Sequence, residues 1–108
     1  MDYPEMITHL PEADIPFTGV RGWILQGENQ QLVFMDIDPI GEVTEHTHGA
    51  QFGVVLDGEM SLTIDGQTRR CKKGDTYYIP EGVPHSAVFH SHVKAIDMFD
   101  EKRRYRAK

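Results

Sequence analysis

Turn residues divide most of this chain into short apolar stretches. After residue 20, Gly, Pro and Asp recur between runs rich in Val, Ile, Leu, Phe and Tyr. Asp-Gly between β-rich runs is a strong hairpin signal, and it occurs at Asp57-Gly58 and Asp65-Gly66. The pattern predicts strands over 22–26, 32–37, 53–56, 61–64, 67–72, 75–79, 86–89 and 93–99. An all-β fold is therefore expected, and a closed jelly roll or small barrel suits 108 residues.

The two ends of the chain carry few strand signals. Pro4, Pro11 and Pro16 interrupt the first 20 residues, which we expect to form an arm with short pieces of structure. Helix could form only over 2–10 and 101–107. The length predicts one domain over residues 1–108.

Charge and composition limit the partners. The net charge of −6, with histidines neutral, argues against nucleic acid and anionic membranes. The basic run over 102–108 is short and terminal, so we expect a solvated tail. The one cysteine, Cys71, cannot form an internal disulfide. No basic-then-apolar leader begins the sequence, and no apolar run approaches the roughly 18 residues of a membrane-spanning helix. These features predict a soluble, cytoplasmic protein.

Three histidines are candidate metal ligands. Alternate residues of a strand point the same way, so a strand through His46-Thr47-His48 would present two imidazoles on one face. His85 follows a proline-rich corner, 80–84, that could aim it back at this pair. Imidazole nitrogen binds transition metals well. Three imidazoles with open positions are typical of a catalytic site rather than a closed structural one.

Gln51 is the fourth candidate ligand. It could share the face of His46 and His48 only if the chain shifts register between His48 and Gln51, which Gly49 and Ala50 would permit. The alternative is an ordinary strand residue, with the metal held by three histidines and water. We predict one divalent ion, with Zn, Ni, Fe, Mn, Co and Cu as candidates. A second His-x-His pair, His90-Ser91-His92, lies between two predicted strands, and we expect a solvated turn there.

Two segments resemble the cupin motifs. Residues 41–58 follow the first motif, which is Gly, a spacer, His-x-His, a short spacer, Glu, six residues and Gly. Residues 74–85 follow the second, Gly, five residues, Pro-x-Gly, two residues and His. The resemblance implies a double-stranded β-helix barrel with the metal inside its mouth. The two spacers that flank the His-x-His pair are each one residue short, Gln51 replaces the usual Glu, and Phe89 replaces the usual terminal Asn. A neutral Gln oxygen would leave more of the metal's charge for the substrate.

The tail is similar to the end of the pectin-degradation (KdgF-like) cupins. Those proteins use three His and a Gln, and they ketonise ring-opened or unsaturated uronic acids from pectin and alginate. Over residues 93–103 the resemblance implies functional roles for Asp97, Phe99 and Arg103. Arg104 competes with Arg103 for its role. The chain also has Asp100-Glu101-Lys102 where that family usually has Ser-Pro-Pro.

Asp97 is the candidate general acid/base. The predicted strand 93–99 is largely apolar on both faces, where an unpaired carboxylate would be costly. Asp97 either faces the metal cavity as a proton carrier or forms an ion pair with Arg21, Arg103 or Arg104. We take Asp97 and Arg103 as candidate catalytic residues, and Phe99, Arg104 and Tyr78 as candidate substrate contacts. Alternation sends Tyr77 and Tyr78 to opposite faces, so one of them could place a hydroxyl in the cavity.

The leading hypothesis is a metal-dependent enzyme of carbohydrate metabolism that isomerises or ketonises a sugar acid, a small oxygen-rich metabolite. The first alternative is a dioxygenase-type cupin. The second is a non-catalytic cupin that binds a sugar or a metal. The apolar outer face of Ile96 and Met98, together with the N-terminal arm, predicts a homodimer.

Overall fold

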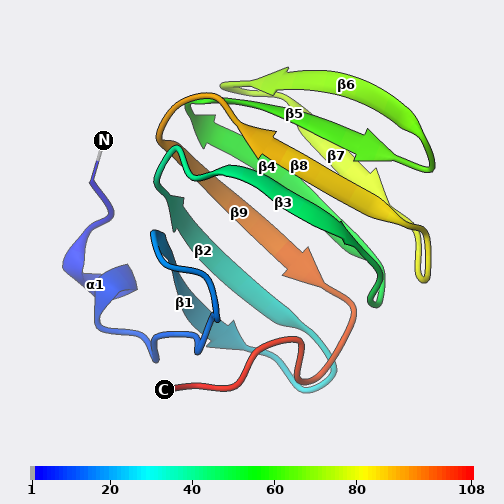
Figure 1. The fold of residues 1–108 in the computed structure, drawn as a ribbon. Helices are drawn as coiled ribbons and strands as arrows, with labels where there is room; N and C mark the ends of the chain where they lie inside the picture. Colours follow the sequence, from blue (N-terminus) through cyan, green and yellow to red (C-terminus); the bar gives the residue numbers. More distant parts are fainter. Residues whose placement is uncertain (1) are drawn as a thin grey trace.

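The computed structural model describes residues 2–108. Within these residues one short helix and nine strands follow in chain order: α1 (Glu5–Thr8), β1 (Val20–Gln26), β2 (Gln31–Ile37), β3 (Gly41–His46), β4 (Gln51–Asp57), β5 (Glu59–Ile64), β6 (Gln67–Lys72), β7 (Thr76–Ile79), β8 (His85–Phe89) and β9 (Val93–Phe99). The strands form two antiparallel sheets, of order β1-β2-β9-β4-β7 and β3-β8-β5-β6. The sheets face each other as two layers (Figure 1). This is the double-stranded β-helix barrel that the resemblance to the cupin motifs implied.

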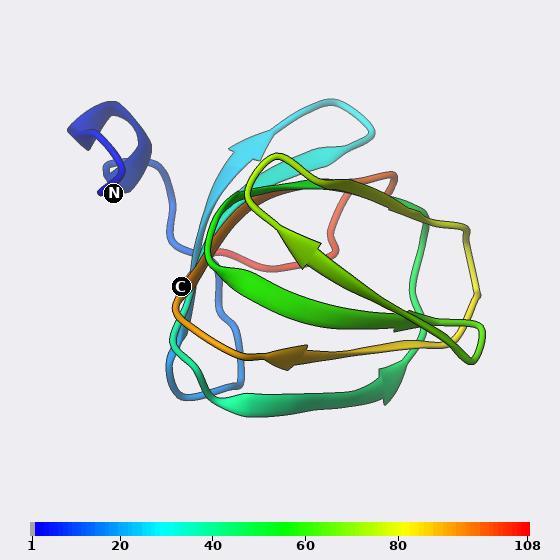
Figure 2. The same cartoon turned by 90° about the horizontal axis from the view of Figure 1, so that it is seen from above.

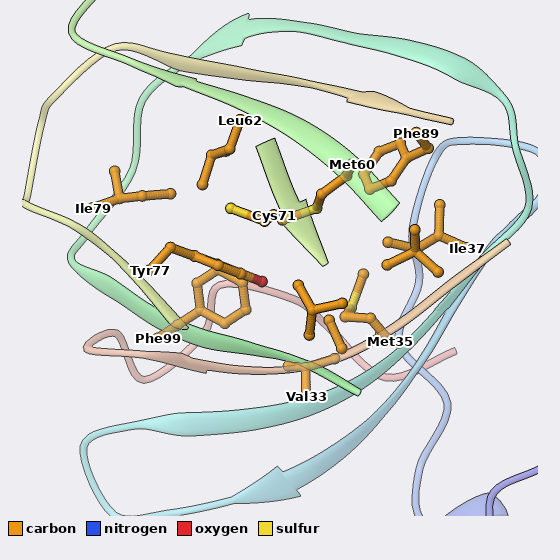
Figure 3. Packing of buried hydrophobic residues seen from close by; sticks show 14 of the residues in the cluster. Val33, Met35, Ile37, Met60, Leu62, Cys71, Tyr77, Ile79, Phe89 and Phe99 are labelled. Atoms are coloured by element: carbon orange, nitrogen blue, oxygen red, sulfur yellow. The ribbon is translucent and has the colours of Figure 1, made fainter. Parts of the chain in front are cut away.

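Alternation of side chains along the strands builds the interior. In β2 every second residue, from Gln31 to Ile37, is buried, as expected when one face of a strand meets a core. The strands wrap around a common interior (Figure 2). The apolar core lies between the layers (Figure 3) and comprises Ala13, Ile24, Val33, Met35, Ile37, Val55, Met60, Leu62, Cys71, Tyr77, Ile79, Phe89, Val93, Ala95 and Phe99.

The two Asp-Gly turns have different roles. Asp65 and Gly66 both have positive φ, 50° and 79°, and join the paired strands β5 and β6 as a true hairpin. The hairpin predicted at Asp57-Gly58 is wrong, because β4 and β5 lie in different sheets. There the chain crosses from one layer to the other. A side chain at position 58 would meet the backbone oxygen of His92 at 2.0 Å, so this crossing requires glycine.

Two other expectations need correction. The strand β3 was not among the predicted strands, because its sequence has two Glu residues and only one large apolar residue, Val43. The helix expected over 101–107 does not form. Instead Ala107 bridges to Ala13, and Glu12 bridges to Trp23, so that arm and tail pair with each other and with β1. Of the helix expected over 2–10 only α1 forms. The described residues contain no helix long and apolar enough to cross a membrane.

Asp36 lies at the centre of a charged cluster on the outer face of β2. It accepts a hydrogen bond from His92, and it lies 3.5 Å from Arg21 Nε and 3.8 Å from Lys94 Nζ. Burial alone would raise the pKa of Asp36, but hydrogen bonds from His92 and Arg21 outweigh it and hold the pKa below its usual value. The stability that Asp36 contributes is therefore complete above its unfolded pKa and is lost as the pH falls through the lower folded pKa.

We expect Asp36→Asn to lower the free energy of unfolding at pH 7 by about 1 kcal/mol. The difference from wild type should shrink as the pH falls below 3.8, because the wild-type carboxyl then becomes protonated as well. Urea unfolding at several pH values measures it. Asp2→Asn, at an exposed position, is the control. A destabilisation that stays constant down to pH 2 would contradict this account.

Candidate metal centre and its cavity

Three histidines from different segments converge at one end of the barrel. His46 ends β3, and His85 begins the neighbouring strand β8 directly opposite it. His48 lies beyond the end of β3, so the two imidazoles of the His-x-His pair are not presented by one continuous strand. One ring nitrogen from each of the three histidines lies within 4.8 Å of the others. The predicted trio is therefore assembled by a strand end, a loop and the start of a second strand.

Backbone carbonyls fix the orientation of all three rings. The Nδ1 atoms lie 2.9 Å from Thr44 O for His46, 2.7 Å from Gly49 O for His48 and 2.9 Å from Val83 O for His85. A carbonyl can only accept, so each Nδ1 donates and each neutral ring keeps its lone pair on Nε2. Such a second contact is typical of histidines that bind a metal through the other nitrogen.

The Nε2 atoms of His48 and His85 lie 2.9 Å apart. Two neutral rings would place lone pair against lone pair at that distance, and a proton or a metal ion between the two nitrogens relieves the repulsion. Zn–N bonds of about 2.0–2.1 Å place two donors of one ion about 3.0–3.4 Å apart, close to the observed separation. The donor set therefore fits a divalent metal.

Burial favours the neutral forms of His48 and His85. It lowers the pKa of His48 to about 4 and lowers the pKa of His85 as well. Metal binding requires deprotonated imidazole, so burial prepares these ligands before any ion arrives.

Gln51 reaches the same cavity from the opposite sheet. The chain crosses between the layers over residues 47–50, and Gln51 is the first residue of β4. The crossing, rather than a register shift within one strand, brings it near the histidines. Its Nε2 donates to Asp97 Oδ1 at 2.9 Å, and its amide oxygen makes no hydrogen bond to the described residues. That oxygen is the atom that could serve as a fourth ligand.

Asp97 is buried beside this cluster and forms no ion pair with any arginine of the described chain. Its Oδ1 accepts hydrogen bonds from Tyr77 Oη at 2.5 Å and from Gln51. Burial raises the pKa of Asp97, and these two hydrogen bonds partly oppose the rise. Arg21, one candidate partner, pairs with Asp36 and Asp38 instead. The carboxyl group is therefore held by neutral donors.

Gly53 makes the contact between Tyr77 and Asp97 possible. It pairs with Tyr77 on one side and with Asp97 on the other. A Cβ at position 53 would lie 2.2 Å from the Tyr77 ring and 2.3 Å from Asp97 Oδ1. The side chains of Tyr77 and Asp97 therefore occupy space that any side chain at position 53 would fill. Figure 3 shows the Tyr77 oxygen directed into the barrel interior.

A cavity of about 370 Å³ contains these polar groups at one end and is otherwise mostly apolar. Phe99 and Arg104 both line it. The Arg104 guanidinium lies 4.4 Å from the centre of the Tyr105 ring and 5.6 Å from that of Phe99. Its Nε is buried and has no hydrogen-bond partner among residues 2–108. An unpaired buried guanidinium nitrogen is a donor available to an anionic ligand.

Other candidates lie away from this cavity. Arg103 is exposed and lines a separate surface groove with Gln26 and Lys102. Tyr78 is 58% exposed on the outer face, so of these two neighbours it is Tyr77 that lines the cavity. His90 contacts Ser61, 2.7 Å from its Oγ, and His92 contacts Asp36. The sequence favoured Tyr78 over Tyr77 as a substrate contact, although a glycine within a predicted strand signals a close approach of neighbouring groups.

The structure is a jelly-roll barrel whose cavity holds three convergent histidines that could bind a metal ion. The cupin domain family matches residues 33–99, and the chain belongs to the cupin family.

Known proteins resemble this chain to different extents. The structure of KdgF from Halomonas sp. has a TM-score of 0.74 and 26% identity, over 85% of this chain and 86% of that one. An RmlC-like cupin from Shewanella frigidimarina has a TM-score of 0.77 and 25% identity, over 96% of this chain and 91% of that one. The HTH-type transcriptional regulator PuuR from Escherichia coli is 46% identical over 46 residues, 43% of this chain but only 24% of the regulator.

Proposed function

We propose that this cupin is a metal-dependent isomerase that ketonises a small sugar acid, such as an unsaturated uronate, in carbohydrate metabolism. One observation carries the proposal: a buried carboxyl group, Asp97, lies hydrogen-bonded to Gln51 in the cavity that also holds the three-histidine cluster. A proton carrier beside a Lewis-acid site is what tautomerisation next to a carbonyl requires. The similarity to KdgF over most of both chains supports it.

Different residues of the cavity would have different roles in this reaction. His46, His48, His85 and the Gln51 oxygen would hold the ion. When bound, a divalent metal supplies a Lewis acid that polarises an oxygen of the ligand. Asp97 would accept or give the proton at its carboxyl group, and Tyr77 and Gln51 keep that group in place. The apolar remainder of the cavity would limit the access of water.

Arg104, rather than Arg103, would bind the substrate carboxylate. Its guanidinium lines the cavity and its Nε is unpaired. A planar guanidinium binds a carboxylate with two parallel hydrogen bonds, which lysine cannot copy. We therefore expect Arg104→Lys to raise KM about tenfold, with a smaller effect on kcat. Arg103→Lys, at the exposed neighbouring position, is the matched control and should leave KM unchanged. Equal KM values for the two variants would contradict the assignment.

The test of the proposed activity is the loss of ultraviolet absorbance from an unsaturated uronate. Metal-loaded protein should accelerate this loss, and a chelator should abolish the acceleration. If fully loaded protein gives only the uncatalysed rate, the proposed reaction is wrong. Oxygen consumption with a small acid would then favour the dioxygenase candidate.

We also propose a homodimer formed through the outer face of the five-stranded sheet. Apolar side chains form a row across this face. Leu25 and Met98 both lie opposite the half-buried Leu32, and Phe52 lies opposite Met98 and Tyr78. Small domains often complete their burial against a second copy.

Light scattering of the wild type at micromolar concentration should give twice the 12.3 kDa mass of one chain. Met98→Glu should shift the mass to that of a monomer, because a charge would be buried at the centre of the interface. Val88→Glu, on the outer face of the other sheet, should leave the dimer intact. A monomeric wild type would refute the interface.

A second candidate is a cupin that binds a small acid as a signal without turning it over. The similarity of part of this chain to a transcriptional regulator favours it. It predicts saturable binding of the acid by metal-loaded protein with no chemical change in the ligand.

A further inference from the structure

The loop that carries His48 has little regular structure of its own. Residues 47–50 lie between β3 and β4 and form no strand ladder. Two backbone hydrogen bonds fix its ends, from Gly82 N to His48 O at 3.0 Å and from Asp100 N to Ala50 O at 2.8 Å. Its middle is held by a side chain, because Gly49 N donates to Glu101 Oε2 at 3.0 Å.

Glu101 also packs against this part of the loop. Gly49 is buried, and a Cβ added to it would lie 2.4 Å from Glu101 Cγ. The Gly49 N–H therefore donates to the Glu101 carboxylate, while the Gly49 carbonyl oxygen accepts from His48 Nδ1 at 2.7 Å. A continuous set of contacts leads from Glu101 through Gly49 to the ring of His48.

We infer that Glu101 is a positioning residue for the metal ligand His48, an inference that rests on the proposed metal site. The segment 100–102 is where the sequence departs from the uronate-ketonising cupins, and the site described above makes no use of it. Arg104, the proposed carboxylate-binding residue, follows three residues after Glu101. The same short part of the chain therefore carries Arg104 and contacts the loop 47–50 that bears His48. Outer contacts of this kind commonly change metal affinity by about 10–100-fold.

Glu101 could act on metal affinity in two ways, by positioning the loop through its hydrogen bond or by the negative charge of its carboxylate, and the two predict different results. A carboxylate near a cation could raise metal affinity by charge alone. Glu101→Gln removes the charge but keeps an oxygen that can accept from Gly49 N–H. Glu101→Ala removes both. The Gln variant therefore separates hydrogen bonding from electrostatic attraction.

The experiment measures the Co²⁺ affinity of the full chain by chelator competition, together with the visible absorption spectrum of bound Co²⁺. We expect Glu101→Ala to weaken binding about 10–100-fold and to alter the spectrum, because the ring of His48 is less well oriented. Glu101→Gln should stay within about threefold of wild type and keep its spectrum. Glu81→Ala removes an exposed carboxylate from the loop before His85 and should change neither quantity.

A second variant tests the contact from the other side. Gly49→Ala should also weaken Co²⁺ binding, because the new methyl group would collide with Glu101 Cγ. In the double variant Gly49→Ala/Glu101→Ala the collision partner is absent, so binding should be no weaker than in Glu101→Ala alone. If Glu101→Ala does not fold, Glu101→Gln and Gly49→Ala still test the contact.

Three results would overturn the inference. They are Co²⁺ binding by folded Glu101→Ala at wild-type affinity, Glu101→Gln binding as weakly as Glu101→Ala, and simple additivity in the double variant. A wild-type protein that binds no Co²⁺ would instead refute the metal site itself, and the inference would fall with it.

Discussion

Asp97→Asn is expected to lower kcat for uronate ketonisation by about 100-fold or more, the usual contribution of a general acid/base. Asn has the same shape as Asp but cannot carry the proton. The variant should fold, because its amide oxygen can still accept from Tyr77, which lies 2.5 Å from Asp97 Oδ1. The metal content should remain that of wild type, because Asp97 does not belong to the group of side chains that could hold the ion. The measurements are kcat by absorbance and metal by elemental analysis.

Asp100→Asn is the matched control for this substitution. Asp100 follows β9, is exposed, and accepts a hydrogen bond from Gln30 Nε2 at 3.2 Å outside the cavity. Its replacement should leave kcat unchanged. If Asp97→Asn keeps wild-type kcat, the proton must move through another group, and the role proposed for Asp97 is wrong.

Substituting any of His46, His48 or His85 by Ala should remove stoichiometric metal from the purified protein. The three imidazoles converge on one point, and the loss of one leaves two nitrogens and a weak amide oxygen. Elemental analysis should show about one metal per chain in the wild type and close to none in each variant. The absorbance assay should show a parallel loss of activity.

His90→Ala is the control, because it removes a histidine from the other His-x-His pair. His90 contacts Ser61 on the surface, away from the trio. The variant should retain full metal content. Loss of metal in His90→Ala with retention in His85→Ala would assign the ion to a different place.

The sequence predicted much of the fold because turn residues and alternation act locally. The Asp65-Gly66 hairpin needs only two residues of positive φ, and both are present. The Asp57-Gly58 turn was misassigned because the same dipeptide can also join strands of different sheets. Whether two strands pair depends on contacts with β8 and β9, which lie far along the chain. The charged strand β3 was missed because it is only partly buried.

The part of the site that lies in sequence motifs of known spacing could be predicted. The histidine trio was expected from two motifs, and the structure brings the three rings together. The choice between Tyr77 and Tyr78 depends on which face of β7 meets the core, which alternation alone does not decide. The contacts of Arg104 and Glu101 depend on how the tail folds back as turns rather than as a helix.

The metal site itself is tested most directly by crystallography of metal-loaded protein at the absorption edge of the bound metal. The account predicts one anomalous peak per chain, about 2.0–2.1 Å from the Nε2 atoms of His46, His48 and His85 if the ion is zinc. A protein with stoichiometric metal but no peak between these three atoms, or with its peak beside His90 or His92, would contradict it.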